Sequence, residues 1–293
     1  MNVTLIVNPI AGNRAFRSIK KIECLLKRKV SLNTFITQKK GDAETFARQI
    51  TLELNSKLRT PNSELLIVAG GDGTFNEVIN GILSALPLAM IPLGTTNVLA
   101  KELGIPENIE GAINLALTGT PKKISLGRIN GRYFSLMVGI GFDGEAVLRV
   151  KNNIIKKISG KGAHILSGFK TLIGYNPSVI EVKTSERTFT GYTAIVGKAH
   201  CYGGYFQVTP KASLTEPLLD LCLFKGRTRR DLVRFISGVI RKRHLDFEDV
   251  FYGKFSELEV SSKGKVHVQI DGDYFGTLPA KIDVVKDAVS VIW

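Results

Sequence analysis

The segment Leu65–Glu77 constrains the fold of this chain more than any other stretch. It starts with five apolar residues, passes through the turn Gly70-Gly71-Asp72-Gly73 and continues with polar residues typical of a helix start. A continuous apolar run is typical of a strand that is buried on both faces, as in a parallel sheet. Three glycines in four positions allow the backbone to approach a ligand closely or to adopt positive φ. The segment therefore predicts a buried strand, a tight glycine turn and a helix.

The same turn has the composition of a phosphate site. The N–H groups of a first helical turn have no partner within the helix, and the helix dipole favours negative charge there. Asp72 stands within the turn, where its carboxylate can meet a metal ion that accompanies a phosphate. A plain turn from strand to helix would need one glycine rather than three. We therefore interpret the turn as a phosphate cradle with a carboxylate beside it.

The first 121 residues alternate between predicted strands and helices, which favours a Rossmann-like parallel α/β domain. Thr37 ends one predicted strand. In parallel sheets, ligands bind outside the carboxyl ends of the strands, so polar turns that follow the strands should converge. Three such turns follow the other predicted strands, at Asn8 to Gly12, Gly70 to Glu77, and Gly94 to Asn97.

From about residue 122 the pattern changes to short, alternating segments joined by turns. Asn130-Gly131 between two such segments is a strong signal for a two-residue hairpin. Near the end of the chain, Asp287 separates two short apolar segments and indicates a further turn. The pattern predicts an antiparallel β-sandwich, with the domains at residues 1–121 and 122–293.

The net charge of +14 favours acidic partners such as nucleotide phosphates or an anionic membrane surface. Aromatic residues are not interleaved with the basic ones as base stacking requires, so we expect no nucleic acid partner. The three cysteines show neither metal-ligand spacing nor a disulfide pattern, which favours a reducing cytoplasm. The chain begins directly in a predicted strand, so we expect no signal peptide. A homodimer is compatible with the sequence.

Two basic segments interrupt the β-rich half. Lys151 to Tyr175 contains lysines and no acid, and Arg229 to Arg243 has an apolar stripe ringed by arginines. The second segment predicts an amphipathic helix that either lies on an anionic bilayer or packs on the sandwich with its charged face in water. Peripheral association with a membrane is therefore one expectation.

Taken together, motifs along nearly the whole chain resemble the diacylglycerol kinase catalytic-domain family, which also includes sphingosine, ceramide and bacterial lipid kinases. The match at Gly70–Val78 is supported by five others in the same order. These are Asn8–Gly12, Pro92–Asn97, Gly139–Asp143, the block Tyr202-Gly203-Gly204 with Pro210-Lys211-Ala212, and Gln269–Asp273.

The resemblance implies an ATP-dependent lipid kinase, with Mg²⁺ and with the nucleotide in the cleft between two domains. It implies that Asp271 is the general base, although from its position alone Asp271 before Gly272 is typical of a turn. It implies a second Mg²⁺ held by Ser213, Glu216 and Leu218. The residues implied to contact the nucleotide are Asn8, Pro9, Ile10, Ala11, Gly12, Thr37, Gly70, Gly71, Asp72, Gly73, Thr74, Phe75, Asn76, Glu77 and Thr95.

Three positions depart from the family pattern. Val98 replaces a common aspartate in the third loop, and Asn13 replaces a common lysine in the first, with Arg14 next to it. If those two charges normally pair, both have been lost together. Pro217 replaces a glycine in the segment implied to hold the second Mg²⁺, which alters that loop.

Two other functions share parts of this pattern. An NAD kinase would share Gly-Gly-Asp-Gly-Thr, but it lacks the block Pro92–Asn97. A non-catalytic lipid- or nucleotide-binding module would not need Asp271 together with Asp72, Asn76 and Glu77. The lipid that accepts the phosphoryl group can be diacylglycerol, a sphingoid base or another hydroxylated lipid. A role in lipid metabolism, such as phospholipid biosynthesis, follows from the lipid kinase reading.

Overall fold

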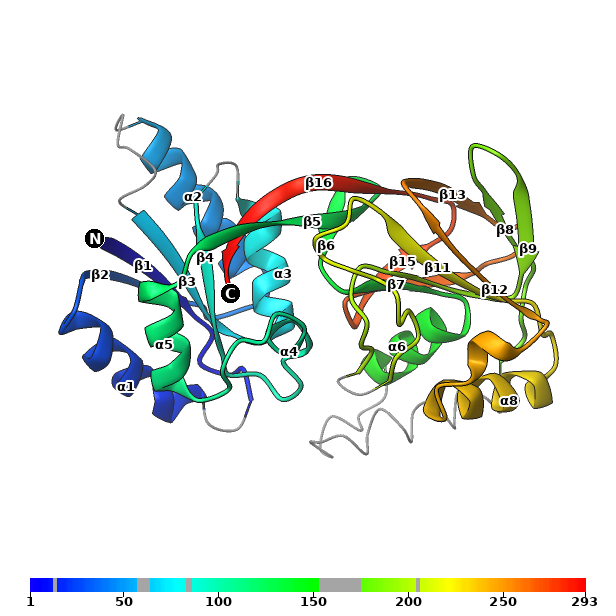
Figure 1. Cartoon of the computed structure of the whole chain (residues 1–293), viewed down its shortest axis with the longest axis horizontal. Helices are drawn as coiled ribbons and strands as arrows, with labels where there is room; N and C mark the ends of the chain where they lie inside the picture. The colour runs from blue at the N-terminus through cyan, green and yellow to red at the C-terminus, as the bar shows by residue number, and fades with distance from the viewer. Residues whose placement is uncertain (13–14, 57–63, 83–85, 153–174, 204–205) are drawn as a thin grey trace. The chain divides into compact units, whose positions relative to one another are not determined.

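The computed structural model describes residues 1–12, 15–56, 64–82, 86–152, 175–203 and 206–293 (Figure 1). The chain forms two compact units. Unit 1 contains Met1–Leu126 with Lys286–Trp293, and unit 2 contains Gly127–Val285. The predicted domains at 1–121 and 122–293 stay a prediction. The compact units differ from them because the last residues, Lys286–Trp293, belong to unit 1.

Unit 1 is built on a parallel sheet with the strand order β2-β1-β3-β4, and the end of β16 adds a fifth strand beside β4. The predicted alternation of strands and helices is confirmed. The elements are β1 (Asn2–Val7), α1 (Ala15–Lys27), β2 (Ser31–Ile36), α2 (Asp42–Ser56), β3 (Glu64–Gly70), α3 (Asp72–Gly81), β4 (Leu88–Pro92), α4 (Val98–Glu102) and α5 (Ile109–Thr118), followed by β5 (Pro121–Ile129) and, at the end of the chain, β16 (Ala280–Ile292).

The core of unit 1 lies between this sheet and its helices. Residues 65–69 of β3 are almost completely buried, as an all-apolar central strand requires. Helix α2 packs on α3, and α1 packs on α5, so that helices cover both faces of the sheet (Figure 1). Gly81 permits the first contact, because a Cβ added there would lie 2.1 Å from the carbonyl oxygen of Glu44.

The strand order also places a topological switch point between β1 and β3. From β1 the chain goes to β2 on one side, and then returns to β3 on the other. Ligands of open parallel sheets bind beside such a switch point, outside the carboxyl ends of the strands. The loops that follow β1 and β3 are Asn8 to Gly12 and Gly70 to Asp72, so the topology brings two of the predicted site segments together.

Unit 2 is antiparallel. One sheet has the order β12-β11-β10-β7-β14-β15, and a second set runs from the first part of β16 through β13 and β8 to β9. The elements are β6 (Arg132–Phe134), β7 (Met137–Ile140), α6 (Phe142–Asn152), β8 (Ile180–Lys183), β9 (Thr188–Gly191), β10 (Thr193–Gly197), β11 (Leu219–Phe224), α8 (Arg229–Ile240), the 3-10 helix η3 (His244–Asp246), β12 (Val250–Phe255), β13 (Glu257–Ser261), β14 (His267–Ile270) and β15 (Asp273–Thr277).

A single hydrophobic cluster joins the two sets of strands. It contains Val138 and Leu221 from the first and Val182, Leu258 and Ile282 from the second. Sheets that bury apolar faces against each other form a sandwich, so the predicted C-terminal β-domain is confirmed. The Asn130-Gly131 hairpin is also confirmed, since β5 pairs with β6 and both turn residues have positive φ.

The turn predicted at Asp287 is wrong. Asp287 has φ 51°, but the strand continues through it and β16 runs from Ala280 to Ile292. The N–H of Asp287 donates to Ser125 Oγ at 3.3 Å. Before this residue β16 pairs with β13 in unit 2, and after it Val291 pairs with Leu88 in unit 1. A single left-handed residue therefore bends the strand instead of reversing it.

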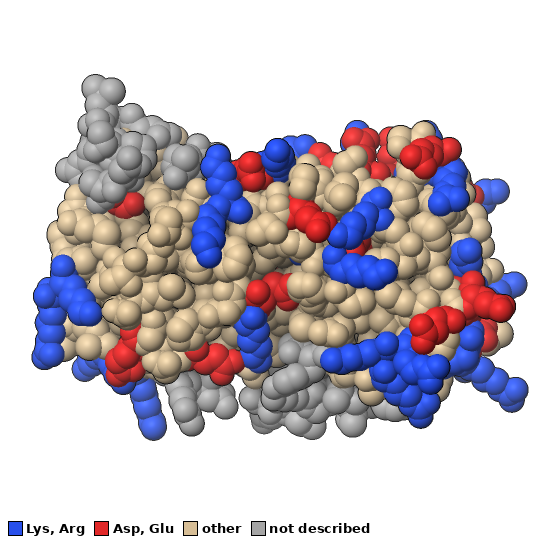
Figure 2. Space-filling model, viewed as in Figure 1, with Lys and Arg blue, Asp and Glu red and all other residues tan. Residues whose placement is uncertain are grey.

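Helix α8 packs its apolar stripe on unit 2. This is the second of the two predicted arrangements, in which the helix lies on the sandwich. Leu232, Phe235 and Val239 are buried, and the ring of Phe235 stacks on Phe224 with centroids 4.6 Å apart. The side chain of Thr228 caps the helix and pairs reciprocally with Asp231. Lys and Arg side chains gather over the outer face of α8 (Figure 2).

Candidate functional site

Three loops at the carboxyl ends of β1, β3 and β4 lie in direct contact within unit 1. A Cβ added to Gly12 would lie 2.6 Å from the carbonyl oxygen of Leu93, and one added to Gly71 would lie 3.2 Å from the Cα of Gly94. Gly12 also has φ 82°, which favours glycine. These glycines let the first and second loops approach the third at backbone distance. The predicted convergence of the three loops is confirmed.

A side-chain hydrogen bond ties the first loop to the second. Asn8 Nδ2 donates to Thr74 Oγ1 at 3.0 Å, and Asn8 Oδ1 accepts from the N–H of Ile10 at 3.1 Å. The same asparagine thus shapes its own loop and holds the first turn of α3. Pro9 and Ala11 are the neighbours of Ile10 in this loop, and the side chain of Ile10 is exposed.

The N-terminus of α3 is open to a ligand. Its N-cap residue is Gly71, which provides no side chain to occupy the first N–H groups. Gly73 is exposed, and a Cβ added there would meet no heavy atom within 4 Å. The side chain of Phe75, on the inner face of α3, is completely buried and anchors the helix. An uncapped helix start with open space beside it can bind an anion.

Asp72 supports the third loop from within the second. Its Oδ2 accepts from the N–H of Val98 and its Oδ1 from the N–H of Leu99, both at 2.9 Å. Asp72 thus caps α4, whose own N-cap residue Asn97 makes no side-chain cap. Burial raises the pKa of the Asp72 carboxyl, while the N–H groups of Leu99 and Val98 act to lower it. Val98 keeps this link through its backbone although its side chain departs from the family pattern.

Asn97 adds a buried polar atom that has no partner among the described residues. Its Nδ2 donates to the carbonyl oxygen of Gly94 at 2.9 Å, whereas its Oδ1 is buried without a hydrogen bond. A buried acceptor without a donor costs free energy. This atom lies in the third loop and was not among the predicted contacts. Protein atoms cover it, so the described part of the chain leaves this acceptor both unpaired and inaccessible.

The other predicted contacts divide into two groups. Thr37 and Asn76 are buried at the end of β2 and in the first turns of α3, while Thr95 is exposed in the third loop. Glu77 points to a neighbouring helix, where its Oε2 accepts from the N–H of Ala43 at 3.2 Å. Glu77 therefore stabilises the start of α2 in this structure.

Asp271 lies in unit 2, in the turn between β14 and β15. Asp271 has φ 48° and Gly272 has φ 89°, as the turn interpretation expected. Asp271 Oδ1 accepts from the N–H groups of Leu136 and Met137 at 2.9 Å each, and Oδ2 accepts from the N–H and Oγ of Ser135 at 2.9 and 3.2 Å. The carboxylate thus fixes the segment that joins β6 to β7.

Comparisons with known proteins follow the same division of the chain. The family model for the diacylglycerol kinase catalytic domain matches residues 2–129, and that for the YegS C-terminal NAD kinase beta sandwich-like domain matches residues 136–293. A diacylglycerol kinase of Bacillus subtilis is 30% identical over 94% of this chain and 91% of the relative. The chain belongs to the diacylglycerol kinase family. It is therefore a lipid kinase by family, which confirms the predicted resemblance.

Further relatives agree with this family. A diacylglycerol kinase of Staphylococcus saprophyticus is 29% identical over 98% of this chain and 93% of the relative. This chain is also similar to a Bacillus anthracis protein whose crystal structure is described as that of a diacylglycerol kinase. The two sequences are 26% identical, and the structures match with a TM-score of 0.81 over 100% of this chain and 95% of that one. An NAD kinase of Archaeoglobus fulgidus in complex with ATP shares the fold alone, at 14% identity and a TM-score of 0.52, covering 100% of this chain and 94% of that one.

In this lipid kinase a buried cluster supports the Asp271 turn. Gln269 Nε2 donates to Asp143 Oδ2 at 2.7 Å, and Gln269 Oε1 accepts from the N–H of Gly272 at 2.7 Å. Tyr202 donates its hydroxyl to Asp143 Oδ1. Burial raises the pKa of Asp143, against the hydrogen bonds from Tyr202 and Gln269. Three segments quoted for the family resemblance meet here, which spacing alone did not reveal.

The carbonyl groups predicted to hold a second Mg²⁺ in the kinase bind an ammonium group instead. Lys198 Nζ donates to the carbonyl oxygens of Ser213 and Glu216 at 2.6 Å and of Leu218 at 3.1 Å. Burial lowers the pKa of Lys198 to about 8, with the carboxylates of Asp220 and Glu216 acting against that shift. These residues do not fit a metal ion, because the amine takes the position that the ion would need.

The loops of unit 1 fit a metal ion that arrives with a nucleotide. Among the described residues there is no group of three or more His, Cys, Asp or Glu side chains that could hold a metal by itself. Mg²⁺ in nucleotide enzymes is bound by one or two carboxylates together with phosphates and water. Asp72 supplies one carboxylate, which besides the two α4 N–H groups also accepts a hydrogen bond from the side chain of Thr96.

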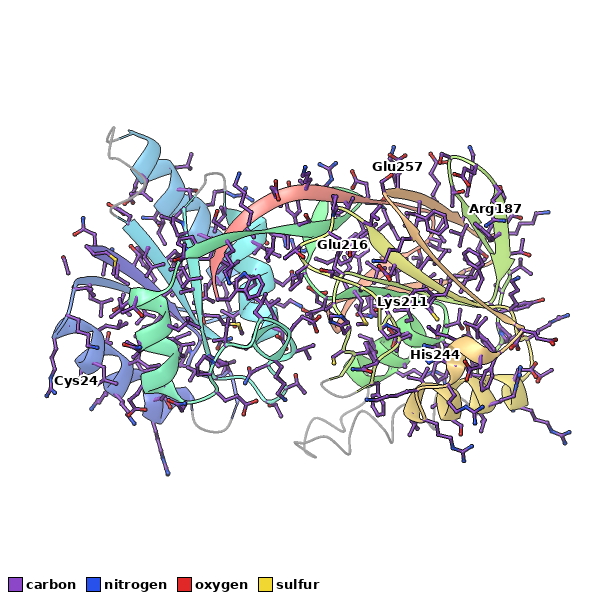
Figure 3. The ribbon with its side chains drawn as sticks, viewed as in Figure 1. Cys24, Arg187, Lys211, Glu216, His244 and Glu257 are labelled. Atoms are coloured by element: carbon purple, nitrogen blue, oxygen red, sulfur yellow. The ribbon has the colours of Figure 1, made fainter. Side chains whose placement is uncertain are left out.

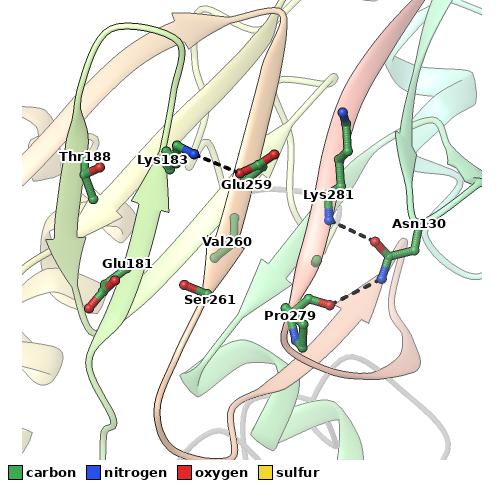
Figure 4. A pocket seen from close by; sticks show the side chains of 10 residues that line it. Asn130, Glu181, Lys183, Thr188, Glu259, Val260, Ser261, Pro279 and Lys281 are labelled. Carbon is green, nitrogen blue, oxygen red and sulfur yellow. Dashed lines mark hydrogen bonds and ion pairs between the residues drawn. The ribbon is translucent and has the colours of Figure 1, made fainter.

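A separate pocket of about 540 Å³ lies in unit 2 (Figure 4). It is lined by outward-facing residues of β8 and β13, including Glu181, and by Asn130 beside β16. Lys183 pairs with Glu259 between these two adjacent strands at 3.5 Å. Its charged lining does not suit an acyl chain, and none of the predicted site residues lies in it.

Some sequence predictions fall outside the described residues. These are Asn13 and Arg14 in the first loop, Gly204 in the Tyr202 block, and the basic segment Lys151 to Tyr175 for its residues 153–174. Among the described residues no helix is long and apolar enough to cross a membrane.

Proposed function

We propose that this kinase transfers the γ-phosphoryl group of ATP to the hydroxyl of a diacylglycerol-like lipid. The observation that carries the proposal is the contact of three glycine-containing loops beside the open N-terminus of α3. In this proposal the phosphates of ATP bind the N–H groups of the first turn of α3.

The proposed reaction needs a donor site and a proton acceptor. The lipid hydroxyl oxygen forms a bond to the γ-phosphorus, the bond to the β-phosphate bridging oxygen breaks, and ADP leaves with that electron pair. The hydroxyl proton passes to the carboxylate of Asp271. Of its four hydrogen bonds given above, that from Ser135 Oγ is the longest, so a substrate hydroxyl would displace this one at Oδ2. The proposal assigns the donor to unit 1 and the proton acceptor to unit 2.

We assign Mg²⁺ to the nucleotide rather than to a protein cage. Mg²⁺ would neutralise charge on the phosphates, and Asp72 would hold it or its bound water. Because Asp72 also caps α4, the same carboxylate would couple the position of the ion to the third loop.

The acceptor is proposed from the relatives, which are named diacylglycerol kinases. The test supplies labelled ATP and Mg²⁺ with a panel of lipid alcohols in mixed micelles: diacylglycerol, a sphingoid base, ceramide and monoacylglycerol. We expect the fastest transfer to diacylglycerol. Faster transfer to another lipid would replace the acceptor, and transfer only to NAD would refute the proposal.

We also propose that the outer face of α8 contacts an anionic membrane. Arg230 lies in the first turn of α8, Arg241 is its C-cap residue, and Ile240 at the end of the helix is 59% exposed. Basic residues around exposed apolar groups favour binding to anionic lipids. Arg234 is less suited to this role, because it forms an ion pair with Asp249.

Vesicle sedimentation tests the membrane proposal. The double variant Arg230→Gln with Arg241→Gln should bind phosphatidylglycerol vesicles roughly 30-fold more weakly, because each charge near the surface contributes about 1 kcal/mol. The control variant, Lys263→Gln with Lys265→Gln, removes the same charge from an exposed loop of unit 2. Equal binding by both variants would contradict a specific role for α8.

A further inference from the structure

Lys198 lies at the centre of a loop whose carbonyl groups point inward. Its side chain is completely buried, and it directly follows β10, so the backbone holds it in place. The three carbonyl oxygens of Ser213, Glu216 and Leu218 lie within 3.1 Å of Nζ. An ammonium group has three N–H donors, and each can serve one of these carbonyl groups.

We propose that Lys198 is a built-in cation that takes the place of a structural metal ion in the loop at residues 213–218. Carbonyl and carboxylate oxygens are ligands for Mg²⁺ and Ca²⁺, so the loop has the donor set of a metal site. In this chain the side-chain ammonium satisfies that set from within the protein. The loop therefore folds without a divalent ion, whichever lipid the kinase phosphorylates.

The charges around the loop are balanced with the lysine in place. The carboxylate of Glu216 forms an ion pair with Lys254. Asp220 is buried, accepts from the hydroxyl of Tyr252 at 2.6 Å and lies 4.0 Å from Lys254 Nζ. Lys198 and Lys254 together match these two carboxylates. An added divalent ion would leave excess positive charge and would have to displace the amine.

The structure also implies that removing the amine creates a metal site. Lys198→Ala would leave the loop carbonyls unpaired in a space that the side chain has vacated. The net charge of the cluster would then be negative, with Glu216 and Asp220 facing Lys254 alone. A divalent ion could enter this space, whereas Lys198→Met would fill much of it with an uncharged side chain of similar length.

Thermal melting in EDTA, in Mg²⁺ and in Ca²⁺ tests the proposal. The wild-type protein should melt at the same temperature in all three, and both Lys198 variants should melt roughly 5–10 °C lower. Mg²⁺ or Ca²⁺ should restore part of this loss in Lys198→Ala but not in Lys198→Met. Lys211→Met is the control, because Lys211 is exposed in the same unit (Figure 3). Its ammonium lies over the ring of Tyr252.

Two melting results would overturn the proposal. One is a saturable stabilisation of the wild type by Mg²⁺ that Glu216→Gln abolishes, because the ion would then bind at the loop. The other is a Lys198→Ala variant that is as stable as Lys211→Met or that neither ion stabilises.

Amine labelling of the wild type keeps the test decisive if the variants do not fold. With a mild acetylating reagent, Lys211 should react and Lys198 should stay protected, with or without Mg²⁺. Acetylation of Lys198 at the rate of Lys211, or acetylation that increases when Mg²⁺ is added, would show that the amine does not hold the loop.

Discussion

Gly73→Ala separates the stability of α3 from its proposed role in binding phosphate. The added Cβ would meet no heavy atom within 4 Å, and Gly73 lacks a positive φ, so neither a clash nor backbone strain is expected. Alanine in a helix is more stable than glycine by about 1 kcal/mol. Unit 1 should therefore melt at a temperature roughly 3 °C higher in this variant.

The same methyl group should weaken ATP binding. In the proposed function, the phosphates lie against the first turn of α3, and the methyl would occupy part of that space. The loss of one charge-assisted hydrogen bond costs about 2 kcal/mol, or roughly 30-fold in Kd. Calorimetric titration with Mg-ATP measures this change, and melting in the absence of nucleotide measures the stability.

Asn114→Ala is the matched control, because Asn114 is an exposed residue of α5 and its replacement also improves helix propensity. It should raise the melting temperature without changing the affinity for ATP. Unchanged ATP affinity in a more stable Gly73→Ala variant would refute the placement of phosphate at the start of α3.

Three further predictions concern other parts of the molecule. Asp271→Asn should abolish transfer and also lower the free energy of unfolding by about 2–4 kcal/mol in urea, because its NH₂ group would face backbone N–H donors; an active variant excludes Asp271 as the base. Gly71→Ala should lower the melting temperature and raise the Kd for ATP, since its Cβ would lie 3.2 Å from Gly94 Cα; no change in either would contradict the loop contact. Burial lowers the pKa of His244 from 6.5, so the folded protein favours the neutral ring. Stability should be fully present above about pH 6.5 and decline below it as the unfolded chain takes up the proton, and a wild-type urea midpoint that stays constant from pH 7.5 to 5.5 would contradict this.

The sequence predicted the parts of the fold that leave a local signature. A central strand buried on both faces must be apolar throughout, and residues 65–69 show this directly. Asn130-Gly131 predicted a hairpin, because both residues must adopt positive φ. The meeting of the three loops followed from the rule that ligands bind at the carboxyl ends of parallel strands.

Other features depend on contacts between distant segments. Asp72 caps a helix that begins at Val98, and nothing in its own neighbourhood indicates that partner. Asp287 between two short apolar segments is compatible with a turn or with a bend in a continuing strand, and the structure has the strand continue through it with φ 51°. Lys198 was not predicted at all, since a single lysine in a sequence gives no sign that it will bind buried carbonyl groups.

The central claim, phosphoryl transfer to a lipid hydroxyl, is tested most directly by one product measurement. The protein is incubated with diacylglycerol in mixed micelles, Mg²⁺ and ATP labelled at the γ-phosphate, and labelled lipid and ADP are quantified together. We predict labelled phosphatidic acid and ADP in equal amounts. ADP and free phosphate without labelled lipid would contradict the claim.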